Sequence, residues 1–142
     1  MDDILRLTQE AFELNDVKTK EVNSLVLAYV GDAVYELVIR TMDSSNPKHV
    51  NKLNKESVKY VNAHAQAMLI TAIKDDLTEE EFWFYNRGKN TRTKSSSKNA
   101  GMKEYHMATG FEALVGHLYL SHQTERMLEL IKLGISRLDA GK

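Results

Sequence analysis

The chain has 142 residues, no cysteine and a formal net charge of -1. Without cysteine it can form neither a disulfide nor a thiolate metal site, and no apolar run approaches the roughly 18 residues of a membrane span. A single proline among many Leu, Ala, Lys, Glu and Met residues favours helices, and the length suits one core. We therefore expect residues 1–142 to form a single all-α domain, located in the cytoplasm and not attached to a membrane.

Three helices are expected in the first part of the chain. A short amphipathic helix is predicted over residues 3–15. A longer, mostly apolar helix is predicted to begin at Asn23 or Ser24, either of which can cap it, and to end near Met42. Asn46-Pro47 is typical of a cap followed by proline in a first helical turn. The helix that starts there would carry on one face Lys48, Lys52, Lys55 and Lys59.

Capping patterns also predict the next two helices. Asn62 is expected to cap a helix that ends near Ile73. Thr78 and Glu81 have the spacing of a capping box, which would start a helix that carries the aromatic residues 82–85. Because four adjacent side chains point to all sides of a helix, we expect this helix to be packed on more than one flank.

Charge is segregated in the second half of the chain. Residues 82–103 contain no acid, which on a nearly neutral protein indicates a local site for a polyanion. From about 88 to 101 the sequence is rich in Lys, Ser, Asn and Thr, so a mobile basic loop is expected there. The basic residues between positions 82 and 103 are Arg87, Lys89, Arg92, Lys94, Lys98 and Lys103. After this segment, two last helices are predicted, over roughly 102–121 and 124–138.

One acid interrupts the apolar stripe of the second predicted helix. Positions 25, 28, 32, 35 and 39 recur at helical spacing and are apolar except for Asp32, which is therefore expected in the core. An ionised carboxylate costs on the order of several kcal/mol to bury unless a cation compensates it. That cation is either a metal ion or a basic side chain, such as Arg40 or a lysine from elsewhere. Glu36 is instead expected to pair with Arg40 at i,i+4.

A second acid, Glu112, lies in the apolar segment 108–120. Gly31 directly precedes Asp32, and Gly116 follows Glu112 by one helical turn. Because glycine weakens a helix, two such glycines indicate a close approach, and the simplest geometry has the two helices crossing there. Both acids would then face one small polar site.

The chemistry of such a site follows from its ligands. Two convergent carboxylates suit a hard cation, Mg2+ or Mn2+ as its substitute, and leave open whether one ion or two bind. A metal held by carboxylates beside a basic surface fits phosphodiester hydrolysis. His64, His106 and His117 are assigned no catalytic role, and no nucleophile-elbow pattern occurs.

Two short segments resemble the catalytic domains of ribonuclease III. Residues 28–34, AYVGDAV, are similar to the signature segment of that family, and residues 111–116, FEALVG, to its second metal-binding segment. With the RGKN sequence at 87–90 between them and the chain end soon after, they resemble the Mini-ribonuclease III branch, which lacks an attached double-stranded RNA-binding domain. The resemblance covers about residues 22–138.

This resemblance implies an all-helical homodimer that hydrolyses double-stranded RNA with Mg2+. In bacteria the substrate is typically the precursor of large-subunit (23S) ribosomal RNA, and help from a ribosomal protein is expected. Asp32 and Glu112 match the catalytic and metal-binding acids. Leu25, Ala28 and Thr109 stand where the wider family has further acids, so a sparse metal shell is expected. RNA binding is predicted for Arg87, Lys89, Asn90, Arg92, Lys94, Lys98, Lys48, Lys52 and Lys55.

Two other interpretations stay open. The missing acids at 25, 28 and 109 suit a non-catalytic RNA-binding or ribosome-assembly module with the same fold, which would not cleave RNA on addition of Mg2+. A helical partner-binding protein with no RNA role would show no salt-dependent affinity for duplex RNA.

Overall fold

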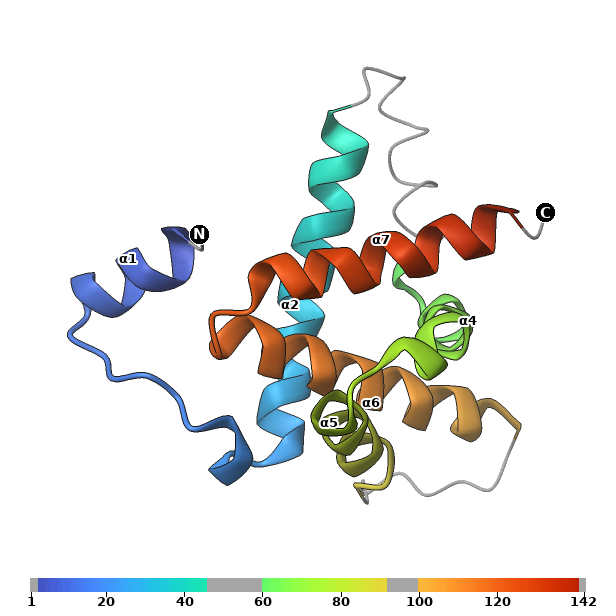
Figure 1. The fold of residues 1–142 in the computed structure, drawn as a ribbon, viewed down its shortest axis with the longest axis horizontal. Helices are drawn as coiled ribbons and strands as arrows, with labels where there is room; N and C mark the ends of the chain where they lie inside the picture. The colour runs from blue at the N-terminus through green and yellow to red at the C-terminus, as the bar shows by residue number, and fades with distance from the viewer. Residues whose placement is uncertain (1–2, 46–59, 92–99, 141–142) are drawn as a thin grey trace.

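The computed structural model describes residues 3–45, 60–91 and 100–140 (Figure 1). Within these ranges every regular element is helical, so the predicted all-α class is confirmed, and none of these helices is both long and apolar enough to cross a membrane. The elements are α1 (Asp3–Ala11), the 3-10 turn η1 (Thr19–Glu21), α2 (Ser24–Ser44), α4 (Ala63–Ile73), the 3-10 turn η2 (Lys74–Asp76), α5 (Glu79–Lys89), α6 (Ala100–Leu120) and α7 (Thr124–Ala140).

Three of these helices begin where local sequence signals predict. The side chain of Asn23 caps α2, and that of Asn62 caps α4, each accepting a hydrogen bond of 2.8 Å from a backbone N–H. At the start of α5 the Thr78 hydroxyl accepts from the Glu81 backbone N–H at 3.1 Å, and the Glu81 carboxylate accepts from the Thr78 N–H at 2.9 Å. The predicted capping box is therefore present, because both reciprocal bonds form.

Other predicted boundaries differ from the observed ones. α1 ends at Ala11 rather than near residue 15, because Glu13 adopts a left-handed φ of 53° that a right-handed helix cannot contain. α5 and α6 extend into the segment predicted as a loop, since residues 88–89 and 100–101 are helical. The predicted helix after Asn46-Pro47 lies outside the described residues.

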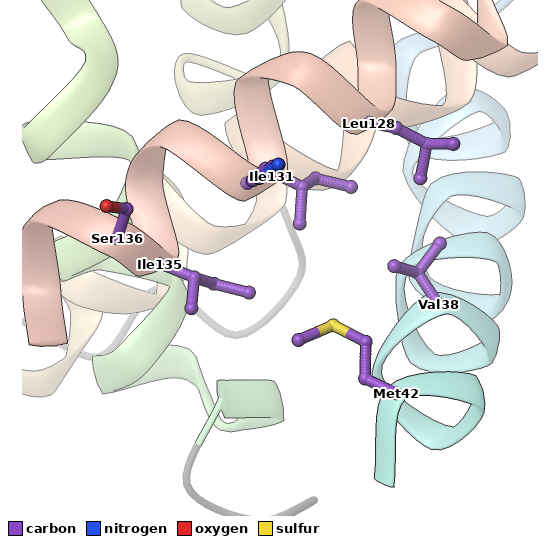
Figure 2. Close-up of a pocket in the computed structure, with 7 residues that line it drawn as sticks. Val38, Met42, Leu128, Ile131, Ile135 and Ser136 are labelled. Carbon is purple, nitrogen blue, oxygen red and sulfur yellow. The ribbon is translucent and has the colours of Figure 1, made fainter. Parts of the chain in front are cut away.

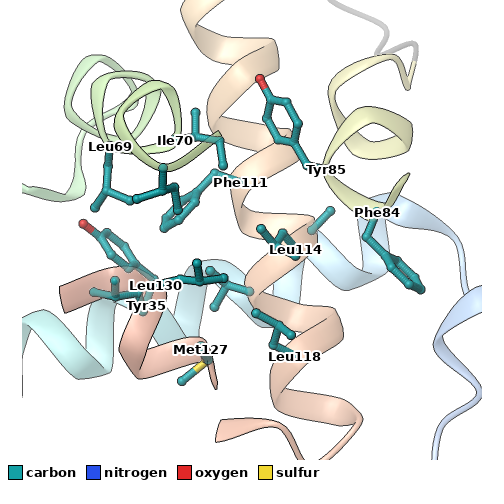
Figure 3. Packing of buried hydrophobic residues seen from close by; sticks show 14 of the residues in the cluster. Tyr35, Leu69, Ile70, Phe84, Tyr85, Phe111, Leu114, Leu118, Met127 and Leu130 are labelled. Atoms are coloured by element: carbon teal, nitrogen blue, oxygen red, sulfur yellow. The ribbon is translucent and has the colours of Figure 1, made fainter. Parts of the chain in front are cut away.

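α6 is the central helix and contacts α2, α4, α5 and α7 (Figure 1). The core gathers around it, with Tyr35 of α2 meeting Phe111 of α6 edge to face at a centroid distance of 5.1 Å (Figure 3). The buried positions of α5 are Glu81, Phe84, Tyr85 and Gly88, which lie on one face.

α5 contacts both α6 and α2, as expected of a helix packed on more than one flank, but its four aromatic side chains do not all take part. Phe82 and Trp83 remain 39% and 45% exposed, whereas Phe84 and Tyr85 are buried. A run of adjacent aromatics therefore does not show which of them are buried, and here α6 makes most of the contacts with α5.

Candidate active site

α2 and α6 cross in backbone contact at two glycines, as the sequence predicts. A Cβ atom on Gly31 would lie 1.7 Å from the carbonyl oxygen of Glu112, and one on Gly116 would lie 2.0 Å from the carbonyl oxygen of Leu27. Not even a methyl group fits between the helices at these points. Because each acid is close to a crossing glycine, the side chains of Asp32 and Glu112 meet and hydrogen-bond each other.

The two carboxylates differ in exposure, and the prediction that Asp32 lies in the core is wrong. Asp32 is exposed, whereas Glu112 is half-buried. The closest approach of α6 is at Gly31, so Asp32 lies about 100° further round α2, at the edge of the contact. Solvent and ions can therefore reach it. The buried positions of α2 are Ser24, Leu27, Ala28, Gly31, Tyr35 and Ile39.

Glu112 is the acid whose environment opposes ionisation. Burial, and next the hydrogen bond and negative charge of Asp32, raise the pKa of Glu112 to about 8, while a hydrogen bond with Gln66 partly opposes the rise. Among the described residues no cationic side chain contributes to this shift. Arg40, the alternative partner of Asp32, is paired with Glu36 as predicted. In the part of the chain that the structure describes, a half-buried carboxylate is thus left without a compensating positive charge.

Gln66 is a third residue of the site, and the sequence analysis missed it. It lies on α4, is 2% exposed, and donates through Nε2 to the carbonyl oxygen of Val61 at 2.9 Å. Its side chain also hydrogen-bonds Glu112. The available signal was a long polar side chain between Ala65 and Ala67 in a mostly apolar helix.

The donor set of this site fits Mg2+, because both acids offer the oxygen ligands that this ion prefers and, among the described residues, no basic side chain shifts the pKa of Glu112. In the described part of the chain no cluster of three or more His, Asp or Glu side chains is placed to bind a metal. Ala28 and Thr109 are buried, and the Thr109 hydroxyl donates to the Tyr105 carbonyl oxygen at 3.0 Å.

The predicted RNA-binding residues fall into three groups. Arg87 is half-buried and its Nη2 donates to the Val22 carbonyl oxygen at 2.6 Å, so its side chain ties α5 to the segment before α2. Lys89 is half-buried at the end of α5, and Asn90 is exposed. Their RNA contacts stay predictions. The remaining positions lie outside the described residues: Arg92, Lys94, Lys98, Lys48, Lys52 and Lys55.

His117 and His64 make contacts within the fold. His117 is buried, stacks on Phe84 at a centroid distance of 3.6 Å, and shares a hydrogen bond of 2.8 Å with the Thr19 hydroxyl. His64 pairs with Glu104 at the surface. These contacts join helices and do not involve the two carboxylates.

An apolar pocket of about 430 Å³ lies between the C-terminal half of α2 and α7 (Figure 2). Its walls include Val38 and Met42 of α2 and Leu128, Ile131 and Ile135 of α7. Because neither Asp32 nor Glu112 lines it, this pocket is separate from the carboxylate site.

Known proteins are similar to this chain in sequence and in fold. The model of the ribonuclease III domain family matches residues 25–123, a range that contains both acids and Gln66. The chain is 47% identical over 129 residues to a Mini-ribonuclease 3 of Clostridium tetani, covering 89% of this chain and 84% of that protein. A Mini-ribonuclease 3 of a Thermoanaerobacter species is 42% identical over 132 residues, which is 89% of this chain and 93% of that one.

A solved structure agrees with these matches. The crystal structure of a protein from Fusobacterium nucleatum, 34% identical, superposes with a TM-score of 0.72 over 82% of this chain and 93% of that chain. The resemblance inferred from the two motifs is confirmed. The chain belongs to the Mini-ribonuclease 3 family of endoribonucleases, which is built on the ribonuclease III domain.

Proposed function

We propose that this chain hydrolyses phosphodiester bonds in double-stranded RNA with Mg2+, held by Asp32 and Glu112. The observation that carries the proposal is the meeting of two carboxylates at the Gly31–Gly116 crossing, with no basic side chain of the described residues neutralising Glu112. Family membership supports the reaction class.

The different surroundings of the two acids suit different tasks. Asp32, exposed at the edge of the helix contact, can hold the ion on the side that faces RNA, and half-buried Glu112 can hold it from the protein side. When bound, Mg2+ supplies an activated water and positive charge beside the phosphate. Glu112 must give up its proton to become a ligand, so the ion and the proton compete for this carboxylate.

The proposed substrate is A-form RNA, in nature the 23S ribosomal RNA precursor. A duplex of this form is recognised mainly through phosphates and 2′-hydroxyl groups. The absence of acids between residues 82 and 103 favours such contacts next to the second acid-bearing helix. Affinity that comes from phosphate contacts should fall steeply with salt.

Exposed apolar side chains support a homodimer. On the outer face of α2, Val26 is 49%, Tyr29 81% and Leu37 55% exposed, and these positions lie close to one line along the helix. Exposed apolar side chains that share one face of a helix can form part of an interaction surface. A two-fold dimer could present one equivalent site to each strand of a duplex. Further exposed apolar residues lie on and after α1: Ile4, Leu7, Phe12 and Leu14.

The test is incubation of the purified chain with duplex RNA and with precursor ribosomal RNA, in Mg2+, in Mn2+ and in chelator, followed by mapping of the RNA ends. We expect cleavage that needs the ion and stops on chelation. Binding without cleavage in either metal would favour the non-catalytic module. The observation in favour of that alternative is that the described residues place no cluster of three or more His, Asp or Glu side chains at the site. Absence of both binding and cleavage would contradict both functions.

A further inference from the structure

Gln66 is a buried amide whose hydrogen bonding is incomplete. Gln66 lies on α4, which contacts α6, and is 2% exposed, and its Oε1 atom has no hydrogen-bond partner among the described residues. An unpaired carbonyl oxygen in a protein interior is unfavourable. An apolar side chain of the same size would avoid this cost, so packing alone does not account for an amide here.

The carbonyl group of Val61 determines which way the amide points. A carbonyl oxygen only accepts hydrogen bonds, so the Gln66 atom 2.9 Å away from it must be Nε2, which carries two hydrogens. One hydrogen is used on Val61. The other is free for Glu112, the acid that the Gln66 side chain hydrogen-bonds across the α4–α6 contact.

We propose that Gln66 is a positioning residue, whose Nε2 holds the Glu112 carboxylate in the orientation that binds the divalent cation. This inference rests on the proposed metal-dependent function. A neutral amide suits the task, because it fixes the carboxylate without competing for its negative charge, whereas an arginine or lysine would neutralise it. Hydrogen-bonded partners behind the ligands of a metal typically matter to its affinity nearly as much as the ligands.

The first experiment compares Gln66→Met with Asn62→Ala. Gln66→Met keeps a similar size and removes the amide. Asn62→Ala is the matched control, since it removes the N-cap of the same helix, a bond of 2.8 Å to a backbone N–H, without changing a side chain that contacts Glu112. Affinity for Mn2+ alone is measured by electron paramagnetic resonance of the free ion, and the Mg2+ concentration for half-maximal duplex cleavage is measured beside it.

We expect Gln66→Met to weaken Mn2+ binding and to raise the Mg2+ requirement by about tenfold or more, the range typical of groups that orient metal ligands. Asn62→Ala should lower thermal stability and leave both metal readouts close to wild type. If wild type binds and cleaves but Gln66→Met behaves like Asn62→Ala, the inference is overturned while the proposed function stands. If wild type neither binds Mn2+ nor cleaves duplex RNA, both fall.

A second measurement needs no Gln66 variant. Protein labelled with 15N-glutamine shows the side-chain amides of its three glutamines, of which Gln9 bonds Asp16 at 3.2 Å and Gln123 bonds Ser121 at 2.8 Å, away from Glu112. Gln9→Met and Gln123→Met identify the Gln66 signal by elimination. Titration with Mg2+ should shift the Gln66 amide and leave the other two in place. A Gln66 signal unmoved by Mg2+ at concentrations that support cleavage would overturn the inference.

Discussion

Asp32 and Glu36 are acids one turn apart on α2, and only Asp32 meets Glu112. We expect Asp32→Asn to slow duplex cleavage by roughly 100-fold or more, a loss typical of removing one group that acts electrostatically on the transition state. RNA affinity in chelator should persist, because the charge removed does not attract phosphate. Glu36→Gln is the matched control and should retain activity, since Glu36 pairs with Arg40. Retained cleavage by Asp32→Asn would exclude Asp32 from the mechanism.

The raised pKa of Glu112 makes the metal-free protein sensitive to pH. The folded value of about 8 lies above the ordinary 4.5, so between these values the folded chain holds a proton that the unfolded chain has lost. The protonated form of Glu112 therefore favours the folded state. This stabilisation, relative to high pH, is complete below pH 4.5 and is lost as the pH rises through about 8. We expect urea unfolding in chelator to show this decline in wild type and a shallower one in Glu112→Gln. Equal slopes would show that Glu112 ionises normally.

The crossing of α2 and α6 depends on helix backbones that touch. Gly116→Ala places a methyl group 2.0 Å from the Leu27 carbonyl oxygen, so the helices must separate. We expect a loss of at least about 3 kcal/mol in the free energy of unfolding, the upper end of typical overpacking. The same change at Gly101, exposed near the start of the same helix, should be neutral or slightly stabilising. Urea unfolding measures both, and equal stabilities would contradict the backbone contact.

α5 and α7 are joined by a bidentate ion pair between Glu81 and Arg126, with both contacts at 2.9 Å. Glu81 is 4% exposed, so Arg126→Met would leave its carboxylate buried without its ion-pair partner, at a cost of about 3–5 kcal/mol. Arg6→Met is the control, because the Arg6–Glu10 pair is exposed and worth about 1 kcal/mol or less. Thermal unfolding of both variants at pH 7 makes the comparison. If both variants lost similar thermal stability, the Glu81–Arg126 pair would contribute no more to stability than an exposed pair does.

The proposed dimer makes a prediction for the whole molecule. Tyr29 is 81% exposed on α2, one turn before Asp32, so a charge there should oppose association through this face. We expect Tyr29→Asp to shift the molecular mass in light scattering from dimer to monomer and to reduce duplex cleavage. Tyr105→Asp, on the exposed side of α6, is the matched control and should remain dimeric. If both variants and wild type have the mass of one chain, the homodimer is wrong.

Local signals predicted much of this molecule. Asn23, Asn62 and the Thr78–Glu81 box mark helix starts because caps act within one helical turn. The meeting of Asp32 and Glu112 was also predictable, because a glycine close to each acid in an apolar helix indicates that another helix backbone comes close there. The family followed from the same two segments.

Other features depend on which faces of distant helices touch, and periodicity along one helix carries no such information. Asp32 is exposed because α6 approaches α2 most closely at Gly31, one residue before it. Gln66 joins the site only because α4 packs on α6, and Arg87 turns to the Val22 carbonyl only because α5 lies near the segment before α2. The acids and glycines of the site were therefore visible in the chain, while the exposure of each acid and the amide beside Glu112 arose from packing between helices.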